Sequence, residues 1–344
     1  MKKIIIFFIL IFVSIAFLLQ GIFLVKDSNL REEKFFLVEK GESAFQIGKN
    51  LEKEGLIKNR FFFDFYIVLK LSQKKLQAGE YSLNPSMNIS KIAQKIISGD
   101  VAKEILTIPE GWNLRDIGWY LEGKGMFQVE ELFELVGFPL IDYSITKDLP
   151  KPKDFSADFD FLKDKPKTIN LEGYLFPDTY YINRGANLEE IVRKMLDNFG
   201  QKLTIDLRNE IKKQKKTIFD IVRMASLIEK EIKTLEDKKL VSGILWKRLK
   251  NKIPLQVDAT ITYITGKKDT GVSKAETEIN SLYNTYKYQG LPLGPISNPG
   301  LDSILAAIYP ENSQYWYYLS NSDGQTIFSK TLEEHNYAKA KYLR

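Results

Sequence analysis

An unbroken apolar run opens the chain, "MKKIIIFFILIFVSIAFLLQGIFLVKD". Lys2 and Lys3 precede it, and residues 4–25 contain no charged side chain. As a helix those residues would extend about 33 Å, enough to cross a hydrocarbon core of about 30 Å. No small-x-small cleavage site follows the run. The pattern therefore predicts an uncleaved membrane anchor over residues 1–26 rather than a cleaved signal peptide.

Charges on both flanks of the apolar run bear on its orientation. The two N-terminal lysines favour a cytoplasmic N-terminus, although Lys26, Arg31 and Lys34 lie on the other flank. We expect a short cytoplasmic N-terminus, a single crossing through residues 4–25, and the bulk of the chain on the outer side. Residues 27–34 are polar and are expected to form a short tether.

After residue 34 the spacing of apolar residues alternates between the patterns of short strands and short helices. "FFLVEKGESAFQIGKNLEKEGLI" predicts a strand, a turn and a helix with Ser43 as its N-cap. An aromatic helix is expected over 61–71. "LQAGEYSLNPSMNISKIAQKIISGD" predicts another strand and a helix that starts near Asn88 and ends before Gly99. Residues 35–104 are therefore expected to form a small α+β module.

Residues 105–344 predict a larger α+β domain. Asn113 suits the N-cap of an amphipathic helix, and residues 145–170 are rich in Pro, Lys and Asp, which is typical of a loop. Further helices are expected over 188–199 and over 218–232. "LQVDATITY", residues 255–263, has the pattern of a strand.

Composition removes several kinds of chemistry. The chain is 44% hydrophobic and 27% charged, which is typical of a folded protein. It has no cysteine, which excludes disulfides, thiolate metal sites, cysteine nucleophiles and a lipid-modified cysteine. One histidine, His335, is too few for a multi-histidine metal site. We expect no metal and no cofactor. The net charge of +6 is mild because lysines and acids are interspersed, and nucleic acid is not an expected partner.

"MASLIEKEIKTLED", residues 224–237, raises the question of whether one of its carboxylates points inward. On a helical wheel that starts at Ile218, Glu229 falls within an apolar face, while Glu231 falls on the opposite side. A carboxyl group in apolar surroundings has a raised pKa and can act as a general acid. The pattern thus favours Glu229 as the chemical group and Glu231 as a solvated partner for a lysine. A buried structural glutamate stays open as the alternative.

Three other stretches carry candidate binding groups. Alternation in 255–263 would place Gln256 and Asp258 on one face. "LYNTYKYQGLPLGPISNPG", residues 282–300, joins tyrosines that could face a sugar ring to a Gly- and Pro-rich loop. "IFSKTLEEHN", residues 327–336, clusters polar groups near the C-terminus. Each stretch also has an ordinary structural explanation.

Taken in order, several motifs resemble the YceG-like family of endolytic murein transglycosylases. They are "LTIPEGWNLRDI", "LEGYLFPDTYYI", "MASLIEKE", "LQVDATITY", "YNTYKYQGLPLGPISNPG" and "FSKTLEEHN", within residues 105–336. The resemblance implies a LysM-like module over residues 35–104 and a YceG-like catalytic domain over 105–344. It also implies a bacterial cytoplasmic membrane as the location, with peptidoglycan synthases as candidate partners.

The resemblance also implies an activity and a set of site residues. The family cleaves the β-1,4 bond between N-acetylmuramic acid and N-acetylglucosamine in peptidoglycan glycan strands without water, leaving 1,6-anhydro ends. One glutamate then suffices as acid and base, and by motif position that role falls on Glu229. The residues expected to line or buttress the glycan cleft are Glu172, Gln256, Asp258, Tyr283, Asn284, Thr285, Tyr286, Ser329, Glu334, His335 and Asn336.

Two alternatives stay open at this point. The chain could be a non-catalytic scaffold that holds glycan for the cell-wall synthesis machinery. It could also be a hydrolase that produces reducing ends, which would need a second carboxylate or a positioned water. Asp258 is the candidate for that second carboxylate.

Overall fold

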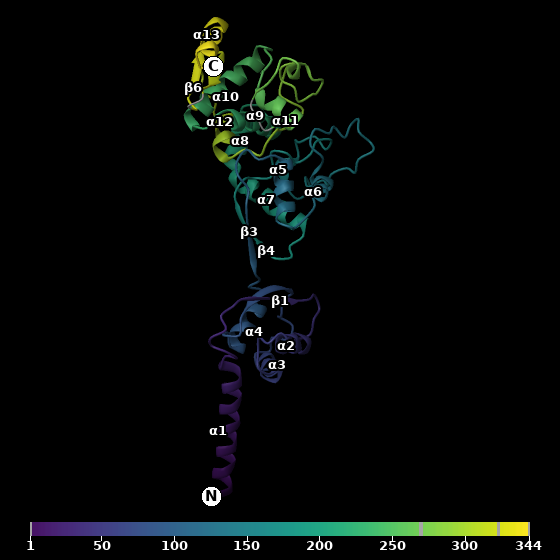
Figure 1. The fold of residues 1–344 in the computed structure, drawn as a ribbon, viewed down its shortest axis with the longest axis vertical. Coiled ribbons are helices and arrows are strands. Elements are labelled where there is room, and N and C mark those ends of the chain that lie inside the picture. Colours follow the sequence, from purple (N-terminus) through teal and green to yellow (C-terminus); the bar gives the residue numbers. More distant parts are fainter. Residues whose placement is uncertain (1, 268–270, 322–323, 343–344) are drawn as a thin grey trace. The chain divides into compact units, whose positions relative to one another are not determined.

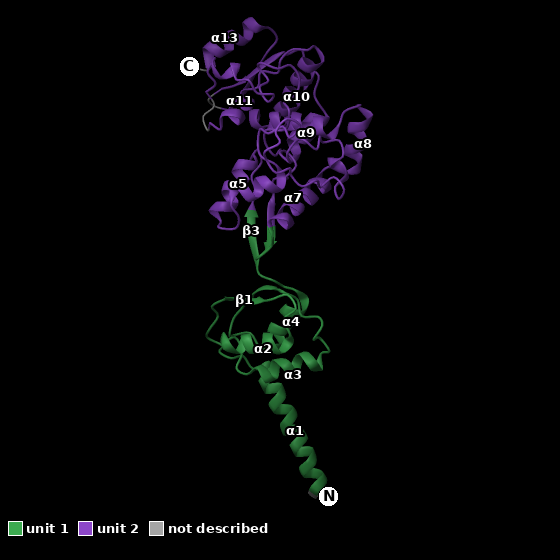
Figure 2. Ribbon diagram, turned by 90° about the vertical axis from the view of Figure 1, so that its right-hand side faces the viewer, with its two compact units in different colours: residues 1–106, 181–187 green, residues 107–180, 188–344 purple. Residues whose placement is uncertain are grey.

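The computed structural model describes residues 2–267, 271–321 and 324–342. It forms two compact units (Figure 2). The first comprises the chain up to residue 106 together with 181–187, and the second comprises 107–180 and the chain from 188 onward. The described part of the chain combines helices with three short two-stranded sheets, which confirms the predicted α+β class (Figure 1). The predicted domain limits, at 26, 34 and 104, stay predictions.

The first unit begins with the apolar helix α1, Lys2–Phe23. Within the described ranges it is the helix whose length and composition would allow it to cross a membrane. Its last turns pack against the rest of the unit. The Phe17 ring lies 5.3 Å from the Phe62 ring, and Ile22 is buried in the module core.

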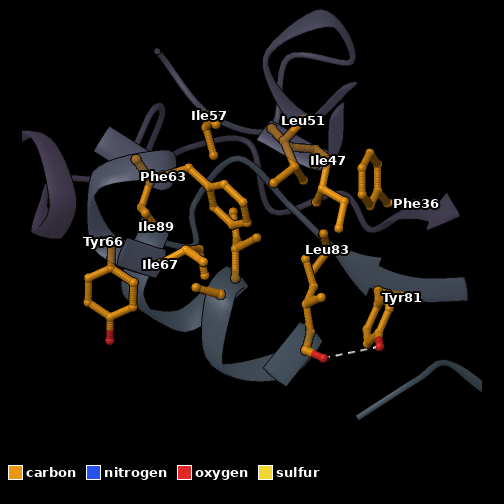
Figure 3. Close-up of a cluster of buried hydrophobic side chains, with 14 of the residues drawn as sticks. Phe36, Ile47, Leu51, Ile57, Phe63, Tyr66, Ile67, Tyr81, Leu83 and Ile89 are labelled. Atoms are coloured by element: carbon orange, nitrogen blue, oxygen red, sulfur yellow. Dashed lines mark hydrogen bonds between the residues drawn. The ribbon is translucent and has the colours of Figure 1, made fainter. Parts of the chain in front are cut away.

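A two-stranded antiparallel sheet and three helices form the compact module that follows α1 in the first unit. They are β1 (Lys34–Val38), α2 (Ala44–Lys53), α3 (Arg60–Leu69), β2 (Gly79–Leu83) and α4 (Ile89–Ser98). Phe36 pairs with Tyr81 across the sheet, and both side chains lie in the buried cluster of Figure 3. The predicted caps are confirmed, because Ser43 and Asn88 accept backbone N–H groups at the starts of α2 and α4. The LysM-like character of this module stays a prediction.

The second unit is mainly helical. β3 (Lys103–Thr107) pairs with β4 (Thr179–Asn183), and most of this strand pair, residues 103–106 and 181–183, belongs to the first unit. In the second unit β5 (Tyr317–Ser320) pairs antiparallel with β6 (Thr326–Ser329). Its helices and 3-10 turns are α5 (Leu114–Gly123), α6 (Val129–Val136), η1 (Asp160–Leu162), α7 (Leu188–Lys202), α8 (Ile205–Lys213), α9 (Ile218–Glu231), α10 (Leu235–Lys250), α11 (Asp258–Thr265), η2 (Glu276–Glu278), α12 (Leu301–Ile308) and α13 (Leu332–Tyr342).

Helix α9 forms the centre of the second unit and contacts α8, α10, α11 and α12. Two side chains accept hydrogen bonds at the start of α9. The Thr217 hydroxyl accepts the Asp220 N–H, and the Asp164 carboxylate accepts the Ile218 N–H at 2.6 Å. Met224 and Leu227 are fully buried although they lie off the predicted apolar face. The helix is therefore covered on more than one side, and an apolar stripe does not define its inner surface.

The strand predicted over 255–263 is wrong. The chain turns at Gln256, whose φ of 56° is left-handed, and α11 begins at Asp258. The predicted alternation nevertheless survives in burial, because Leu255 and Val257 are buried while Gln256 and Asp258 are exposed. The two polar side chains therefore do share the outer side of this turn.

Candidate active site

The two glutamates at the end of α9 have separate sets of partners. This separation agrees with the opposite wheel positions expected for Glu229 and Glu231, which lie two residues apart. Glu229 is buried, as predicted, but among polar groups rather than apolar ones, and Glu231 is half-buried rather than solvated.

Glu229 lies among hydrogen-bond donors rather than in apolar surroundings. Its carboxylate accepts the Gly300 N–H at 3.0 Å and the Ser303 hydroxyl at 2.6 Å, and the Lys238 ammonium lies 3.4 Å away. Gly300 is the N-cap of α12, so this carboxylate caps that helix, where its negative charge is favoured. The side chains of Glu229 and Lys238 are 8% and 4% exposed. These contacts describe a buried ion pair that ties α9 to α10 and α12.

Glu231 is half-buried and is not the solvated partner of a lysine. Burial, followed by the negative charge of Asp258, raises the pKa of its carboxyl group to about 7. The Ala259 N–H and the Tyr318 hydroxyl donate to the carboxyl group and partly oppose this rise. Near neutral pH such a group exchanges a proton readily, which is what a general acid and base requires.

Asp258 is an electrostatic neighbour of Glu231, and the Tyr286 hydroxyl donates to it. The buried Arg248 guanidinium donates to the side-chain oxygen of Gln256 at 2.5 Å. Burial, with the negative charges of Asp258 and Glu231, raises the pKa of Tyr286, so its phenol stays protonated and donates. The predicted residues Asp258 and Tyr286 are therefore brought together here, beside Glu231, which was not predicted as a site residue.

His335 belongs to the edge of the same cluster. Its ring stacks on the Tyr317 ring, with the two centroids 5.2 Å apart. The Arg248 guanidinium also lies over the Tyr317 ring, 5.5 Å from its centroid. Burial, with the nearby cations of Lys339 and Arg248, lowers the pKa of the imidazole. His335 is thus neutral near pH 7, and it packs against Tyr317 on the side of the cluster where Arg248 lies.

A polar pocket of about 280 Å³ opens next to Glu231. It lies between the end of α9, the start of α10 and the β5–β6 strands. Its lining is rich in hydroxyl, amide and charged groups, which suits a sugar and its substituents. The lining residues are Glu231, Lys233, Thr234, Asp237, Ser320, Asn321, Gly324 and Thr326.

Four predicted substrate-binding residues are inaccessible and serve the scaffold instead. Tyr283 is 1% exposed and packs on Tyr263, so it presents no ring to a sugar. The Asn284 amide donates to backbone carbonyls of its own loop, and the Thr285 hydroxyl accepts the Val257 N–H at 3.0 Å. The backbone oxygen of Ser329 accepts the Trp316 N–H, and its side chain is buried. Their burial could not be predicted from residue type, because all four are polar or amphipathic.

Glu172 is also inaccessible, with an exposed fraction of 0%. It accepts the Leu114 N–H at 3.1 Å, the Tyr263 hydroxyl at 3.0 Å and the Asn298 amide at 3.2 Å. Burial raises the pKa of its carboxyl group to about 8. Glu172 therefore joins α5, α11 and the 282–300 loop from inside and does not touch a ligand.

The remaining two predicted residues lie on the exposed face of α13. The Glu334 side chain accepts the Lys330 N–H at 2.7 Å and so fixes the start of that helix, while Asn336 is exposed. Sequence reasoning missed Tyr318 and Arg248, which contact the predicted site residues. A lone tyrosine among several in "YWYYL" and an arginine in a basic helix carried no distinguishing signal. Within the described ranges, no group of three acidic, His or Cys residues could hold a metal ion.

Comparisons with known proteins agree on one family. The model of the YceG-like family matches residues 36–341. An endolytic murein transglycosylase of Bacillus subtilis (strain 168) is 35% identical over 308 residues, which cover 89% of this chain and 84% of that protein. An endolytic murein transglycosylase of Streptococcus pneumoniae (strain R6) is 31% identical over 330 residues, covering 92% of this chain but 60% of the longer relative.

A solved structure gives the same answer. The crystal structure of a YceG-like protein from Listeria monocytogenes is similar with a TM-score of 0.57 and 34% sequence identity, over 90% of this chain and 99% of that one. The family model spans most of the chain, and the Bacillus relative is matched over most of its own length. The chain belongs to the YceG-like family.

Proposed function

We propose that this protein is a membrane-anchored endolytic murein transglycosylase. It would cleave the β-1,4 bond between N-acetylmuramic acid and N-acetylglucosamine within peptidoglycan glycan strands and leave 1,6-anhydro ends. Support comes from membership in the YceG-like family and from relatives named endolytic murein transglycosylase. A polar pocket beside a readily protonated carboxyl group fits this activity.

Glu231, rather than Glu229, is the acid and base in this proposal. The observation that carries it is the raised pKa of Glu231, about 7, at the edge of the pocket and next to Asp258. Glu229 caps α12 and is paired with Lys238. The Gly300 N–H and the Ser303 hydroxyl donate to its Oε2 atom, and the Lys238 ammonium lies 3.4 Å from both of its oxygens. These contacts give Glu229 a structural role, which is to hold α9 to α10 and α12.

The reaction needs one carboxyl group. Protonated Glu231 donates its proton to the glycosidic oxygen, and the bond between that oxygen and the muramyl C1 breaks. The resulting carboxylate then accepts the proton of the muramyl 6-hydroxyl as O6 bonds to C1. The nucleophile belongs to the substrate, the proton count balances, and no water is consumed. The negative charge of Asp258 would also favour the positive charge that develops at C1.

Hydrolysis is the second candidate, because Asp258 lies close enough to Glu231 to raise the pKa of that group. A second carboxylate is what a hydrolase would use to activate water or attack C1. The Tyr286 hydroxyl already donates to Asp258, which occupies one of its oxygens. This contact favours the transglycosylase over the hydrolase.

Helix α1 would anchor the enzyme in the bacterial cytoplasmic membrane, with the bulk of the chain outside. Its length and uninterrupted apolar composition support a single crossing through residues 4–25. This position would bring the enzyme to nascent glycan strands, beside the peptidoglycan synthases that make them.

The test compares the full chain in detergent micelles with its Glu231→Gln and Glu229→Gln variants. Each is incubated with uncrosslinked, stem-bearing glycan strands, and the products are read by mass spectrometry. We expect anhydromuramyl ends from the parent, a loss of about 10²- to 10⁴-fold in Glu231→Gln, and retained activity in folded Glu229→Gln.

Other outcomes separate the alternatives. If Glu229→Gln is folded yet inactive while Glu231→Gln cleaves, the roles assigned to the two glutamates are reversed. Products heavier by one water would mean hydrolysis and would direct attention to Asp258. Strands that are retained but never cut by the parent would identify a glycan-binding scaffold.

A further inference from the structure

Helix α3 is apolar on every side. Phe63, Tyr66 and Ile67 face the module core. The opposite side of α3, together with Leu71 just after the helix, exposes large apolar side chains. A helix that is hydrophobic all round is normally buried in protein or in a membrane. The exposed side chains, with their exposed fractions, are Phe61 (54%), Val68 (55%), Leu69 (63%) and Leu71 (79%).

The one acidic residue of α3 does not interrupt this exposed face. Asp64 points toward α2, where a methyl group on Gly48 would lie 2.7 Å from its Oδ1 atom. Its other oxygen lies 3.9 Å from the Arg60 guanidinium. Burial is the main cause that raises the pKa of Asp64, which agrees with an inward position. The outward face of α3 therefore stays apolar.

Helix α3 also touches α1 at a level inside the apolar run. The Phe62 ring packs on Phe17, and a methyl group on Gly21 would lie 2.2 Å from that ring, so the close approach requires glycine. Phe17 lies about 12 Å along the helix axis from Val25, where the uncharged run ends. If residues 4–25 cross a bilayer of roughly 30 Å, this contact lies at acyl-chain depth.

Basic residues follow the exposed apolar face. Lys70, Lys74 and Lys75 come directly after α3, and all three are exposed. Long basic side chains at the edge of an apolar surface reach anionic lipid headgroups while their stems stay among apolar groups. This combination is typical of helices that lie in a membrane interface.

We propose that the exposed face of α3 inserts into the outer leaflet beside α1, so that a lipid bilayer surface is its partner. The inference rests on the proposed membrane crossing of α1. Two helices would then attach the module to the membrane: α1, which crosses the bilayer, and α3, which lies in its interface. The module, already packed against the end of α1, would thereby be held at the bilayer surface by a second apolar contact.

The absence of cysteine from the whole sequence allows a clean test with single spin labels. We would label Leu69→Cys on α3, Leu19→Cys on α1 and Lys40→Cys in the exposed turn after β1. The full chain is reconstituted in vesicles of phosphatidylethanolamine and phosphatidylglycerol. Power saturation then compares the access of oxygen, which concentrates in lipid, with that of a water-soluble nickel chelate.

We expect positions 19 and 69 to favour oxygen severalfold and position 40 to favour the nickel chelate. Oxygen preference at 19 with nickel access at 69 would overturn the inference and leave the membrane crossing intact. Nickel access at both 19 and 69 would mean that α1 does not cross, and both proposals would fail. Spin–spin broadening at 69 that disappears on dilution with unlabelled chain would show a second copy on this face, which would also overturn it.

Discussion

Glu231 at the end of α9 and Asp258 at the start of α11 form a pair in which the negative charge of Asp258 adds to burial and raises the pKa of Glu231 to about 7. Asp258 itself accepts the hydroxyl of Tyr286. A carboxyl group whose pKa is raised by burial and by a neighbouring carboxylate is typical of acid and base sites. The pair gives the proposed mechanism a pH dependence that can be measured.

Replacing Asp258 by Asn should lower the pKa of Glu231, because the neighbouring negative charge disappears while burial remains. The acid form of Glu231 is lost as the pH rises through its pKa, so cleavage by the parent should decline above about pH 7. In Asp258→Asn this decline should move to lower pH by roughly one unit. The pH profile of kcat/KM for anhydromuramyl product measures the shift.

Asp302→Asn is the matched control, since Asp302 lies on α12 and is an electrostatic neighbour of Glu110. It should leave the profile where it is in the parent. A profile that is unchanged in Asp258→Asn would remove Asp258 from the environment of the acid.

Two tyrosines of the same loop separate site from scaffold. Tyr286→Phe removes the donor to Asp258 and should lower kcat/KM by about tenfold. Tyr283→Phe removes a buried hydroxyl that has no hydrogen-bond partner in the described part of the chain, so activity and Tm should stay close to those of the parent. Equal losses of activity in both variants would contradict the separation.

Local sequence signals predicted much of the fold. Ser43, Asn88 and Asn113 each accept backbone N–H groups at the helix starts where they were expected. Caps are local, because a hydroxyl or amide within three residues satisfies the donors whatever the tertiary structure. The apolar N-terminal helix has the same local character.

The site was harder to predict because burial of polar groups depends on distant segments. The helical wheel separated Glu229 from Glu231 and turned Glu229 inward, yet it revealed neither the polar partners of Glu229 nor the burial of Glu231. The donors that hold Glu229 come from α10 and α12, and the carboxylate beside Glu231 comes from α11. No periodicity within α9 carries that information. Asn284 was misjudged for a different reason: its amide donates to nearby backbone carbonyls of irregular structure, whose course no periodic pattern predicts.

Glu229→Gln should destabilise the second unit, because it leaves the buried Lys238 ammonium without its carboxylate. Breaking a buried ion pair costs about 3 kcal/mol or more, whereas removing both charges costs less. The double variant Glu229→Gln, Lys238→Met should therefore recover part of the loss. Glu236→Gln, in the exposed first turn of α10, should change the free energy of unfolding by less than about 0.5 kcal/mol.

Tryptophan fluorescence during urea unfolding measures this effect in the second unit, which contains Glu229. All 4 tryptophans of the chain, Trp112, Trp119, Trp246 and Trp316, lie in the second unit. The signal therefore reports the unit that contains Glu229 without a contribution from the first. A Glu229→Gln variant as stable as the parent would show that the ion pair does not hold α9 to α10.

Glu172 predicts a pH dependence of stability that is independent of catalysis. Its folded pKa is about 8 against an ordinary value of 4.5, so the folded state keeps a proton that the unfolded state releases. Between about pH 4.5 and 8 the unfolded chain is then favoured progressively, and the free energy of unfolding falls as the pH rises. The full contribution is on the order of a few kcal/mol.

Glu172→Gln should remove this contribution, since an amide can accept the Leu114 N–H but cannot ionise. We expect the fluorescence-detected free energy of unfolding to vary less between pH 5 and 8 in the variant than in the parent. Glu122→Gln, an exposed change on α5, should keep the dependence of the parent. Glu231→Gln should flatten only the part below about pH 7, because its folded pKa is lower. An unchanged slope in Glu172→Gln would mean that this carboxyl group is ionised in the folded protein, held by Leu114, Tyr263 and Asn298 strongly enough to offset its burial.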